Sequence, residues 1–314
     1  MREGESGRHL ALVGTTASGK SAVALAMAAE LGDVEIVSVD SMQVYRGMDI
    51  GTAKPTPEER AAVRHHLIDI AGPEEEFTVA RFQAAAAEVI SDVERRGRRA
   101  LLVGGTGLYL RAVVDQLDVP GQWPGVRAEL EAQVDAGGPD ALCRLYVRLC
   151  ELDPVAAARM LPHNRRRVLR ALEVTLGGGR PFSAYGPGLV AYPPTRYRLA
   201  GISLTADAVA QRIEQRYRAQ LDAGFVDEVR RLAAGAAGLS RTARQALGYR
   251  ELLEYLECGV PLQEAVARAV VRTRRLARRQ RVWFRRDPRI VWHTLEGVGP
   301  NPLAAVPALL GDWE

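Results

Sequence analysis

The sequence predicts an α/β fold in which a parallel sheet is flanked by helices and carries an inserted helical subdomain. Short apolar runs typical of buried strands alternate with longer stretches typical of helices. The strand-like runs are residues 10–13, 35–39, 67–70, 100–103 and 198–203, and the helical stretches are residues 21–31, 78–95 and 108–114. Such alternation is the pattern of βαβ units, whose strands run parallel.

The pattern changes between about residues 119 and 194, where helical stretches are interrupted by Pro and Gly without any strand-like run. Pro- and Gly-rich breakers flank this region and are typical of domain boundaries. We therefore expect a core made of residues 1–119 and 197–314 and an inserted helical subdomain made of residues 120–196. The chain after residue 203 is expected to be mostly helical.

A phosphate-binding motif lies between the first strand-like run and the first helical stretch. It matches the pattern G-x-x-x-x-G-K-[ST] of P-loop proteins. Only two of the 42 lysine and arginine residues are lysines, and Lys20 is in this motif. A compact ammonium fits a loop whose amides already surround a phosphate, whereas a planar guanidinium is too wide. We therefore expect a P-loop NTPase-like core that binds a di- or triphosphate through Gly14, Thr15, Thr16, Ala17, Ser18, Gly19, Lys20 and Ser21.

Other candidate residues follow the strand-like runs, because parallel sheets bind ligands at the carboxyl ends of their strands. Asp40 follows the second run. It suits a helix N-cap, a Mg²⁺ ligand or a proton acceptor. The run 100–103 ends in Gly-Gly-Thr-Gly and lacks the magnesium-binding acid of ATP-hydrolysing machines, which argues against a motor ATPase. Thr106 and the neighbouring amides offer donors for a phosphate oxygen.

Two pairs of arginines are spaced four residues apart and share a helix face. Arg166 and Arg170 follow Asn164, which is typical of an N-cap. Cations are disfavoured at that helix end, so an anion is expected there, with solvation or carboxylate pairing as the alternative. Arg212 and Arg216 could form ion pairs or clamp a diphosphate, and the spacing does not decide between them.

The charge of the chain and its distribution indicate which partners the protein could bind. The net charge is +4 and the pI is about 9.1. Ten arginines between residues 268 and 289 fit either a nucleic-acid surface or a solvated helix face.

No uncharged apolar run approaches the roughly 18 residues of a membrane helix, so we expect a cytoplasmic protein without membrane contact. Cys143, Cys150 and Cys258 form no C-x-x-C pair, which favours buried thiols over disulfides or zinc.

Five segments together resemble bacterial tRNA dimethylallyltransferases and cover nearly the whole chain in order. The most specific segment is residues 38–55, which contains the second lysine, Lys54. Thr15 departs from the family, which usually carries proline there. The segments are residues 14–21, 38–55, 102–109, 153–159 and 247–250.

The resemblance implies transfer of a dimethylallyl group from dimethylallyl diphosphate to N6 of the adenosine 3′ of the anticodon, in tRNAs that read codons beginning with U. Lys20, Thr106, Arg216 and Mg²⁺ on Ser21 would stabilise the departing diphosphate, and Asp40 would take the amine proton. The inserted subdomain would clasp the anticodon stem-loop, and a monomer is expected. The tRNA side would comprise Asp40, Ser41, Met42, Gln43, Thr106, Arg127, Arg166, Arg167, Val168, Leu169, Arg170, Gln245, Ala246, Leu247, Gly248, Tyr249 and Arg250.

Two other classes remain open at this point. An AMP-prenylating transferase or a P-loop nucleotide kinase would keep the phosphate loop and Asp40 but would have little use for an arginine-rich insertion. A non-catalytic RNA-binding protein is disfavoured by the intact set of Lys20, Asp40 and Thr106.

Overall fold

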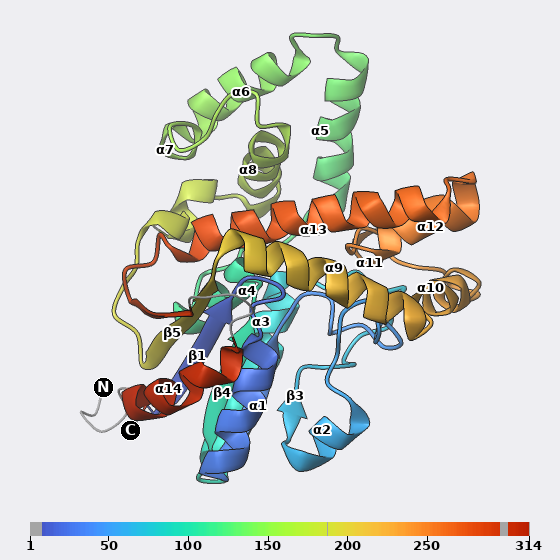
Figure 1. The fold of residues 1–314 in the computed structure, drawn as a ribbon. Helices are drawn as coiled ribbons and strands as arrows, with labels where there is room; N and C mark the ends of the chain where they lie inside the picture. Colours follow the sequence, from blue (N-terminus) through green and yellow to red (C-terminus); the bar gives the residue numbers. More distant parts are fainter. Residues whose placement is uncertain (1–7, 187, 296–300, 314) are drawn as a thin grey trace. The chain divides into compact units, whose positions relative to one another are not determined.

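The computed structural model describes residues 8–186, 188–295 and 301–313, and the chain divides into two compact units (Figure 1). The first unit is formed by residues 1–114 and 194–314, and the second by residues 115–193. We expected the insertion to span residues 120–196. Both of these boundaries lie a few residues after those of the second unit, residues 115 and 193.

The first unit is built on one six-stranded sheet, in which every pair of neighbouring strands is parallel. The strand order is β3-β2-β4-β1-β5-β6. The central strands are fully buried, as expected for a sheet covered on both faces. The α/β prediction is therefore confirmed. The strands are β1 His9–Gly14, β2 Val34–Val39, β3 His65–His66, β4 Arg99–Gly104, β5 Tyr197–Leu204 and β6 Ile290–Leu295.

Two strands differ from the sequence prediction. The third strand is His65–His66 and not residues 67–70, because Leu67 and Asp69 have φ angles of 62° and 60°, which interrupt a strand. The edge strand β6, Ile290–Leu295, was not expected at all. It is partly exposed, and its short pattern beyond the arginine-rich segment gives little periodic signal.

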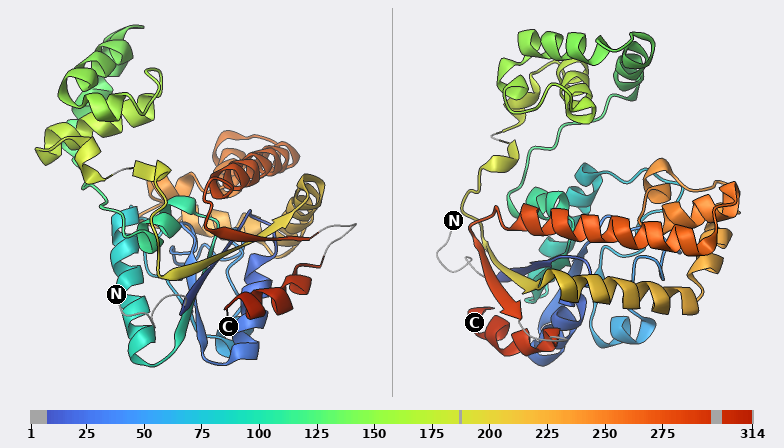
Figure 2. Two further views of the ribbon diagram at one scale, coloured as in Figure 1. Left: turned by 90° about the vertical axis from the view of Figure 1, so that its left-hand side faces the viewer. Right: turned by 45° about the horizontal axis from the view of Figure 1, so that its top comes forward.

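Helices cover both faces of the sheet (Figure 2). Leu10 and Leu12 of β1 pack with α1 and α14, whereas Ala11 and Val13 pack with α3, α4, α9 and α13, because successive side chains of a strand point to opposite faces. The helices of this unit are α1 Lys20–Leu31, α2 Pro57–Ala62, α3 Val79–Arg95, α4 Gly107–Val114, α9 Ala206–Asp222, α10 Phe225–Ala233, α11 Arg241–Arg244, α12 Tyr249–Cys258, α13 Leu262–Phe284, η3 Pro302–Ala305 and α14 Val306–Trp313.

The second unit is helical, as its sequence predicts, and has its own core around Leu130, Leu149 and Leu172. Asn164 caps α8, because its side chain accepts a hydrogen bond from the Arg167 amide. The elements are α5 Pro124–Ala136, α6 Ala141–Leu152, α7 Pro154–Ala157, α8 Arg165–Gly178, η1 Phe182–Tyr185 and η2 Gly188–Val190.

The cysteine prediction was wrong. Cys143, Cys150 and Cys258 are free thiols at exposed positions of α6 and α12. The buried side chains of these two helices come from other positions, on the opposite helix face. Within the described ranges, no helix has the length and apolar character needed to cross a membrane.

Candidate active site

A cavity of about 710 Å³ lies at the carboxyl ends of β1, β2 and β4. The loop after each of these strands contributes to its wall, and α9, α12 and α13 close it from the other side. Ligands of parallel sheets bind at this edge. The cavity therefore brings together the phosphate loop (residues 14–21), the segment after β2 that we call the acceptor loop (residues 40–54), and the segment around Thr106.

The phosphate loop has the backbone conformation that its glycine pattern predicts. Gly19 has a φ of 86° and immediately precedes α1, and Ala17 also has a positive φ, of 61°. Gly14, Thr15 and Ser18 are buried and do not line the cavity. The predicted residues that do line it are Thr16, Ala17, Gly19, Lys20 and Ser21. The amino end of α1 adds positive partial charge to this wall.

Two cations lie in the cavity wall without a carboxylate partner. Lys20 Nζ is 3.3 Å from the Thr15 carbonyl oxygen, and Arg216 Nη1 is 3.2 Å from Thr16 Oγ1. Neither cation forms an ion pair with any part of the chain that the structure describes. Burial lowers the pKa of Lys20 to about 8, against the smaller upward effect of Asp40, and burial also lowers the pKa of Arg216. Unpaired, partly buried cations favour an anionic ligand.

The Asp40 carboxylate is fixed by one oxygen and open at the other. Oδ1 accepts hydrogen bonds from the amides of Met42 at 2.8 Å and Gln43 at 3.3 Å. Oδ2 accepts none from the described residues. Next to it, the Ser41 amide donates to Thr106 Oγ1 at 3.2 Å. Thr106 thus joins the segment after β4 to the acceptor loop, and Asp40 has an oriented acceptor oxygen in the cavity wall.

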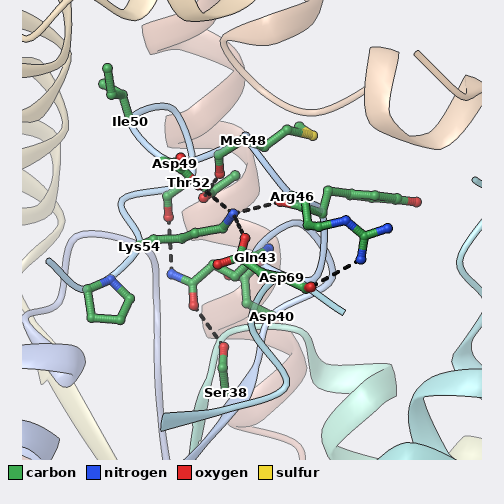
Figure 3. A network of polar contacts seen from close by, with 12 residues as sticks. Ser38, Asp40, Gln43, Arg46, Met48, Asp49, Ile50, Thr52, Lys54 and Asp69 are labelled. Carbon is green, nitrogen blue, oxygen red and sulfur yellow. Dashed lines mark hydrogen bonds and ion pairs between the residues drawn. The ribbon is translucent and has the colours of Figure 1, made fainter. Parts of the chain in front are cut away.

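Gln43 holds the acceptor loop closed across its base (Figure 3). Its Nε2 donates to the carbonyl oxygens of Thr52 and Ala53, both at 3.2 Å. Its Oε1 accepts from Ser38 Oγ at 2.8 Å. The loop that carries Asp40 is therefore tied back to the end of β2 by one side chain.

The ammonium group of the second lysine, Lys54, forms hydrogen bonds to three oxygen atoms. Lys54 Nζ donates to the Tyr45 carbonyl oxygen at 2.6 Å, to Asp49 Oδ1 at 2.6 Å and to Asp69 Oδ1 at 2.5 Å (Figure 3). Arg60 holds the other oxygen of Asp69 at 2.8 Å. An ammonium has three N–H groups, and all three are used here. Lys54 therefore closes the acceptor loop and does not face a ligand.

A buried carboxylate holds the loop from the other side. Glu228 accepts from the amides of Asp49, Ile50 and Gly51 at 2.9, 2.7 and 3.2 Å, and from the Tyr249 hydroxyl at 2.6 Å. Burial, together with the Glu228 carboxylate, raises the pKa of the Tyr249 phenol, which remains a donor. Neither Glu228 nor Lys54 was assigned a role from the sequence, because their partners lie outside any local pattern.

The segment 245–250 forms another part of the cavity wall. Gln245, Ala246, Leu247 and Tyr249 line the cavity. Gly248 has a φ of 86°, and a Cβ there would lie 2.8 Å from the Phe225 ring. Arg250 is exposed and pairs with Glu254, 3.3 Å away.

The arginines that are spaced four residues apart do not act as pairs, because the two members of each pair have different surroundings. Arg216 lines the cavity and Arg212 does not, so the two do not form one clamp there. In the second unit, Arg166 is exposed, whereas Arg170 donates to Glu173 at 2.6 Å and to the carbonyl oxygens of residues 120 and 121.

The remaining residues of the predicted tRNA side in the second unit have different environments. Arg167 is exposed, and Arg127 pairs with Glu131 at 2.7 Å. Val168 and Leu169 are completely buried, so their side chains support the helix from within.

The arginine-rich segment lies mostly on α13 and divides into paired and unpaired cations. Arg268, Arg272 and Arg274 pair with glutamates of neighbouring elements. Among the described residues of this segment, the arginines without an ion pair are Arg275, Arg278, Arg279, Arg281, Arg285 and Arg286. Arg281 instead donates to the Leu204 carbonyl oxygen at 2.9 Å. Arg279 lines the cavity.

A bound metal ion would find few protein ligands. The described part of the chain contains no group of three or more His, Cys, Asp or Glu side chains that could hold one. The Ser21 hydroxyl and the Asp40 carboxylate do line the cavity, and oxygen atoms suit Mg²⁺. This set fits an ion that takes its other ligands from a diphosphate and water.

Comparisons with known proteins agree with this geometry. Residues 43–287 match the family model described as IPP transferase. A tRNA dimethylallyltransferase of Acidothermus cellulolyticus is 48% identical over 91% of this chain and 88% of its own length. A crystal structure of the tRNA isopentenylpyrophosphate transferase of Bacillus halodurans has a TM-score of 0.68 at 37% identity, covering 97% and 96% of the two chains.

A eukaryotic dimethylallyltransferase described as acting on tRNA has a TM-score of 0.75 at 25% identity, covering 91% of this chain and 73% of its own. The family match spans most of the chain, and the sequence relatives cover nearly all of it. The phosphate loop, Asp40 and Thr106 thus lie in one cavity of a protein that belongs to the IPP transferase family, the family of the tRNA dimethylallyltransferases.

Proposed function

We propose that this chain transfers the dimethylallyl group of dimethylallyl diphosphate to N6 of the adenosine 3′ of the anticodon in tRNA and releases diphosphate. One observation carries the proposal: a single cavity joins two cations that lack carboxylate partners to a carboxylate with a free oxygen. The names of the relatives support the same reaction.

The phosphate loop would bind the leaving group. As the bond between the allylic carbon and the diphosphate oxygen breaks, negative charge grows on that oxygen. Lys20, Arg216 and the loop amides are already in place to stabilise it without reorganisation. Mg²⁺ on Ser21, if carried in with the diphosphate, would neutralise part of its charge.

The acceptor loop would activate the nucleophile. The exocyclic amine of adenine is a poor nucleophile, because its lone pair is delocalised into the ring. Asp40 Oδ2 would accept a proton from N6 while N6 forms its bond to the allylic carbon. The fixed Oδ1 keeps the carboxylate oriented during this transfer.

The acceptor base must leave its stack to reach Asp40, which costs less in an anticodon loop than in a duplex. Exposed cations without ion pairs, Arg166 and Arg167 in the second unit and several on α13, suit contacts to the RNA backbone. Because one chain supplies every residue of the cavity wall, we propose that a monomer suffices, working in the cytoplasm with free tRNA.

The test is incubation with labelled dimethylallyl diphosphate and either unmodified tRNA or AMP, followed by mapping of the labelled nucleotide. Label on the adenosine 3′ of the anticodon is expected. Label on AMP alone would identify a small-molecule transferase, and transfer of a γ-phosphate from ATP would identify a kinase. Either result would overturn the proposal.

A further inference from the structure

Gln280 of α13 links two loops that the reaction uses for different purposes. Its Oε1 accepts from the Thr16 amide at 2.8 Å, and its Nε2 donates to the Gly105 carbonyl oxygen at 2.9 Å. These contacts span 264 and 175 residues of sequence. Gln280 also lines the cavity. One side chain therefore connects the phosphate loop to the segment after β4.

The contact with Gly105 is as close as the backbone allows. A Cβ on Gly105 would lie 2.4 Å from Gln280 Nε2, and a Cβ on Gly107 would lie 2.1 Å from Trp283 Nε1. Both glycines are needed for this approach, since such contacts are too short for a carbon atom. The close packing fixes α13 against the segment that carries Thr106.

On the phosphate side, Thr16 is held at two points. Its amide donates to Gln280, and its hydroxyl accepts from Arg216 Nη1 at 3.2 Å. One amide of the phosphate loop is thus already bonded to protein. The loop is held in shape before any ligand arrives, which lowers the cost of binding.

On the acceptor side, Gly105 directly precedes Thr106, whose Oγ1 accepts from the Ser41 amide at 3.2 Å, next to Asp40. The path from Thr16 through Gln280, Gly105 and Thr106 to Ser41 crosses from the leaving-group site to the nucleophile site. Substitution requires these two sites at a fixed separation, and an error of 1 Å is enough to cost about a hundredfold in rate.

On the basis of the proposed function, we infer that Gln280 is a positioning residue that sets the separation between the diphosphate site and Asp40. Its amide group is required because one end must accept and the other must donate. Glutamate keeps the acceptor, loses the donor and places a negative charge beside the anion site. Methionine keeps the length of the side chain and loses both hydrogen bonds.

The experiment compares Gln280→Met and Gln280→Glu with Gln263→Ala, a control at an exposed glutamine on the same helix. Pyrophosphate binding, tRNA binding, thermal unfolding and the rate of transfer at saturating substrates are measured for each. We expect Gln280→Met to weaken pyrophosphate binding about tenfold and to slow transfer by roughly ten- to a hundredfold, with tRNA affinity and the unfolding temperature near wild type. Gln280→Glu should bind pyrophosphate still more weakly.

Unchanged pyrophosphate binding and transfer in Gln280→Met would overturn the inference. Equal losses of tRNA affinity, pyrophosphate affinity and unfolding temperature would also overturn it, because they would show a purely structural role. Wild-type protein that neither binds pyrophosphate nor modifies tRNA would instead contradict the proposed function.

Discussion

The two lysines of this chain belong to neighbouring loops of one site but have opposite surroundings, and of the two Lys20 lines the cavity and Lys54 does not. Within the described ranges, Lys20 in the phosphate loop makes a single hydrogen bond, to the Thr15 carbonyl oxygen at 3.3 Å. Lys54 in the acceptor loop has three oxygen partners within 2.6 Å, two of them carboxylates. Both positions require a compact ammonium, which explains why neither is arginine in so arginine-rich a chain.

The difference shows that one lysine is left available to bind a ligand while the other stabilises the structure of a loop. A partly buried cation without a carboxylate is unfavourable in the unliganded protein and becomes favourable when an anion binds. A cation saturated by carboxylates cannot attract a ligand, but it holds a loop rigidly. The lysine of the phosphate loop is therefore available to a bound donor, whereas the lysine of the acceptor loop holds together the loop that carries Asp40.

The strongest test of the comparison removes the phosphate-loop cation. Lys20→Met should lower the transfer rate by roughly a thousandfold or more, because the lysine stabilises charge that grows on the leaving group. Affinity for tRNA should stay within a few fold in a filter-binding assay. Lys20→Arg should fail similarly, since a guanidinium is too wide for the loop. A variant that lost tRNA binding but handled the donor normally would reverse the assignment.

Asp40→Asn tests the acceptor side directly. The amide cannot take a proton, so transfer should fall by about a hundred- to a thousandfold. Pyrophosphate affinity should remain near that of wild type, because Asp40 is assigned to the other substrate. The measurement is single-turnover transfer together with calorimetric titration of pyrophosphate. Full activity in this variant would exclude Asp40 as the base.

The two lysines should also differ in their effect on stability. Lys54→Met leaves Asp49 and Asp69 without their shared cation and should lower the free energy of unfolding by about 2–4 kcal/mol, below the full cost of a deeply buried pair. Lys20→Met should raise the unfolding temperature at pH 7. Thermal denaturation of both variants without ligand measures this contrast, and destabilisation by both would remove it.

The pH dependence of anion binding should report Lys20. Its pKa of about 8 lies below the ordinary value, so the folded protein is penalised while the group is charged, below pH 8, and the penalty disappears as pH rises from about 8 to 10.5. Anion binding needs the charged form. Pyrophosphate affinity should therefore fall by up to tenfold per pH unit above 8. Dividing by the affinity of Lys20→Met removes the ionisation of pyrophosphate itself, and a flat ratio would refute the assignment.

The smallest effect concerns a similar contrast in the second unit. Arg166→Ala should weaken tRNA binding only a few fold and reduce the slope of log affinity against log salt by about 0.7–0.9, as expected for one phosphate contact. Arg170→Ala should instead destabilise the unit, because Arg170 is already bonded to Glu173 and to two carbonyl oxygens. Identical salt slopes in the wild type and Arg166→Ala would remove Arg166 from the interface.

Prediction from the sequence was best where the signal is local. Four of the five predicted strands were right within a residue or two, because each contains a short apolar stretch that local patterns reveal. The third prediction failed at Leu67 and Asp69, because no local sequence pattern indicates their positive φ angles. The edge strand β6 was missed because its pairing with β5 is needed to define it.

The amino-acid sequence by itself determined the parallel α/β core, the phosphate loop, the position of Asp40 after β2 and the family resemblance, because short contiguous patterns encode all of them. Only the tertiary structure decided which cations stay unpaired and which buried groups hold the loops. Arg212 and Arg216 share a spacing, but only Arg216 lines the cavity. Glu228 and Gln280 bind backbone groups more than 170 residues away. Hydrogen bonds over such separations form only after the chain has folded, and no local periodicity records them.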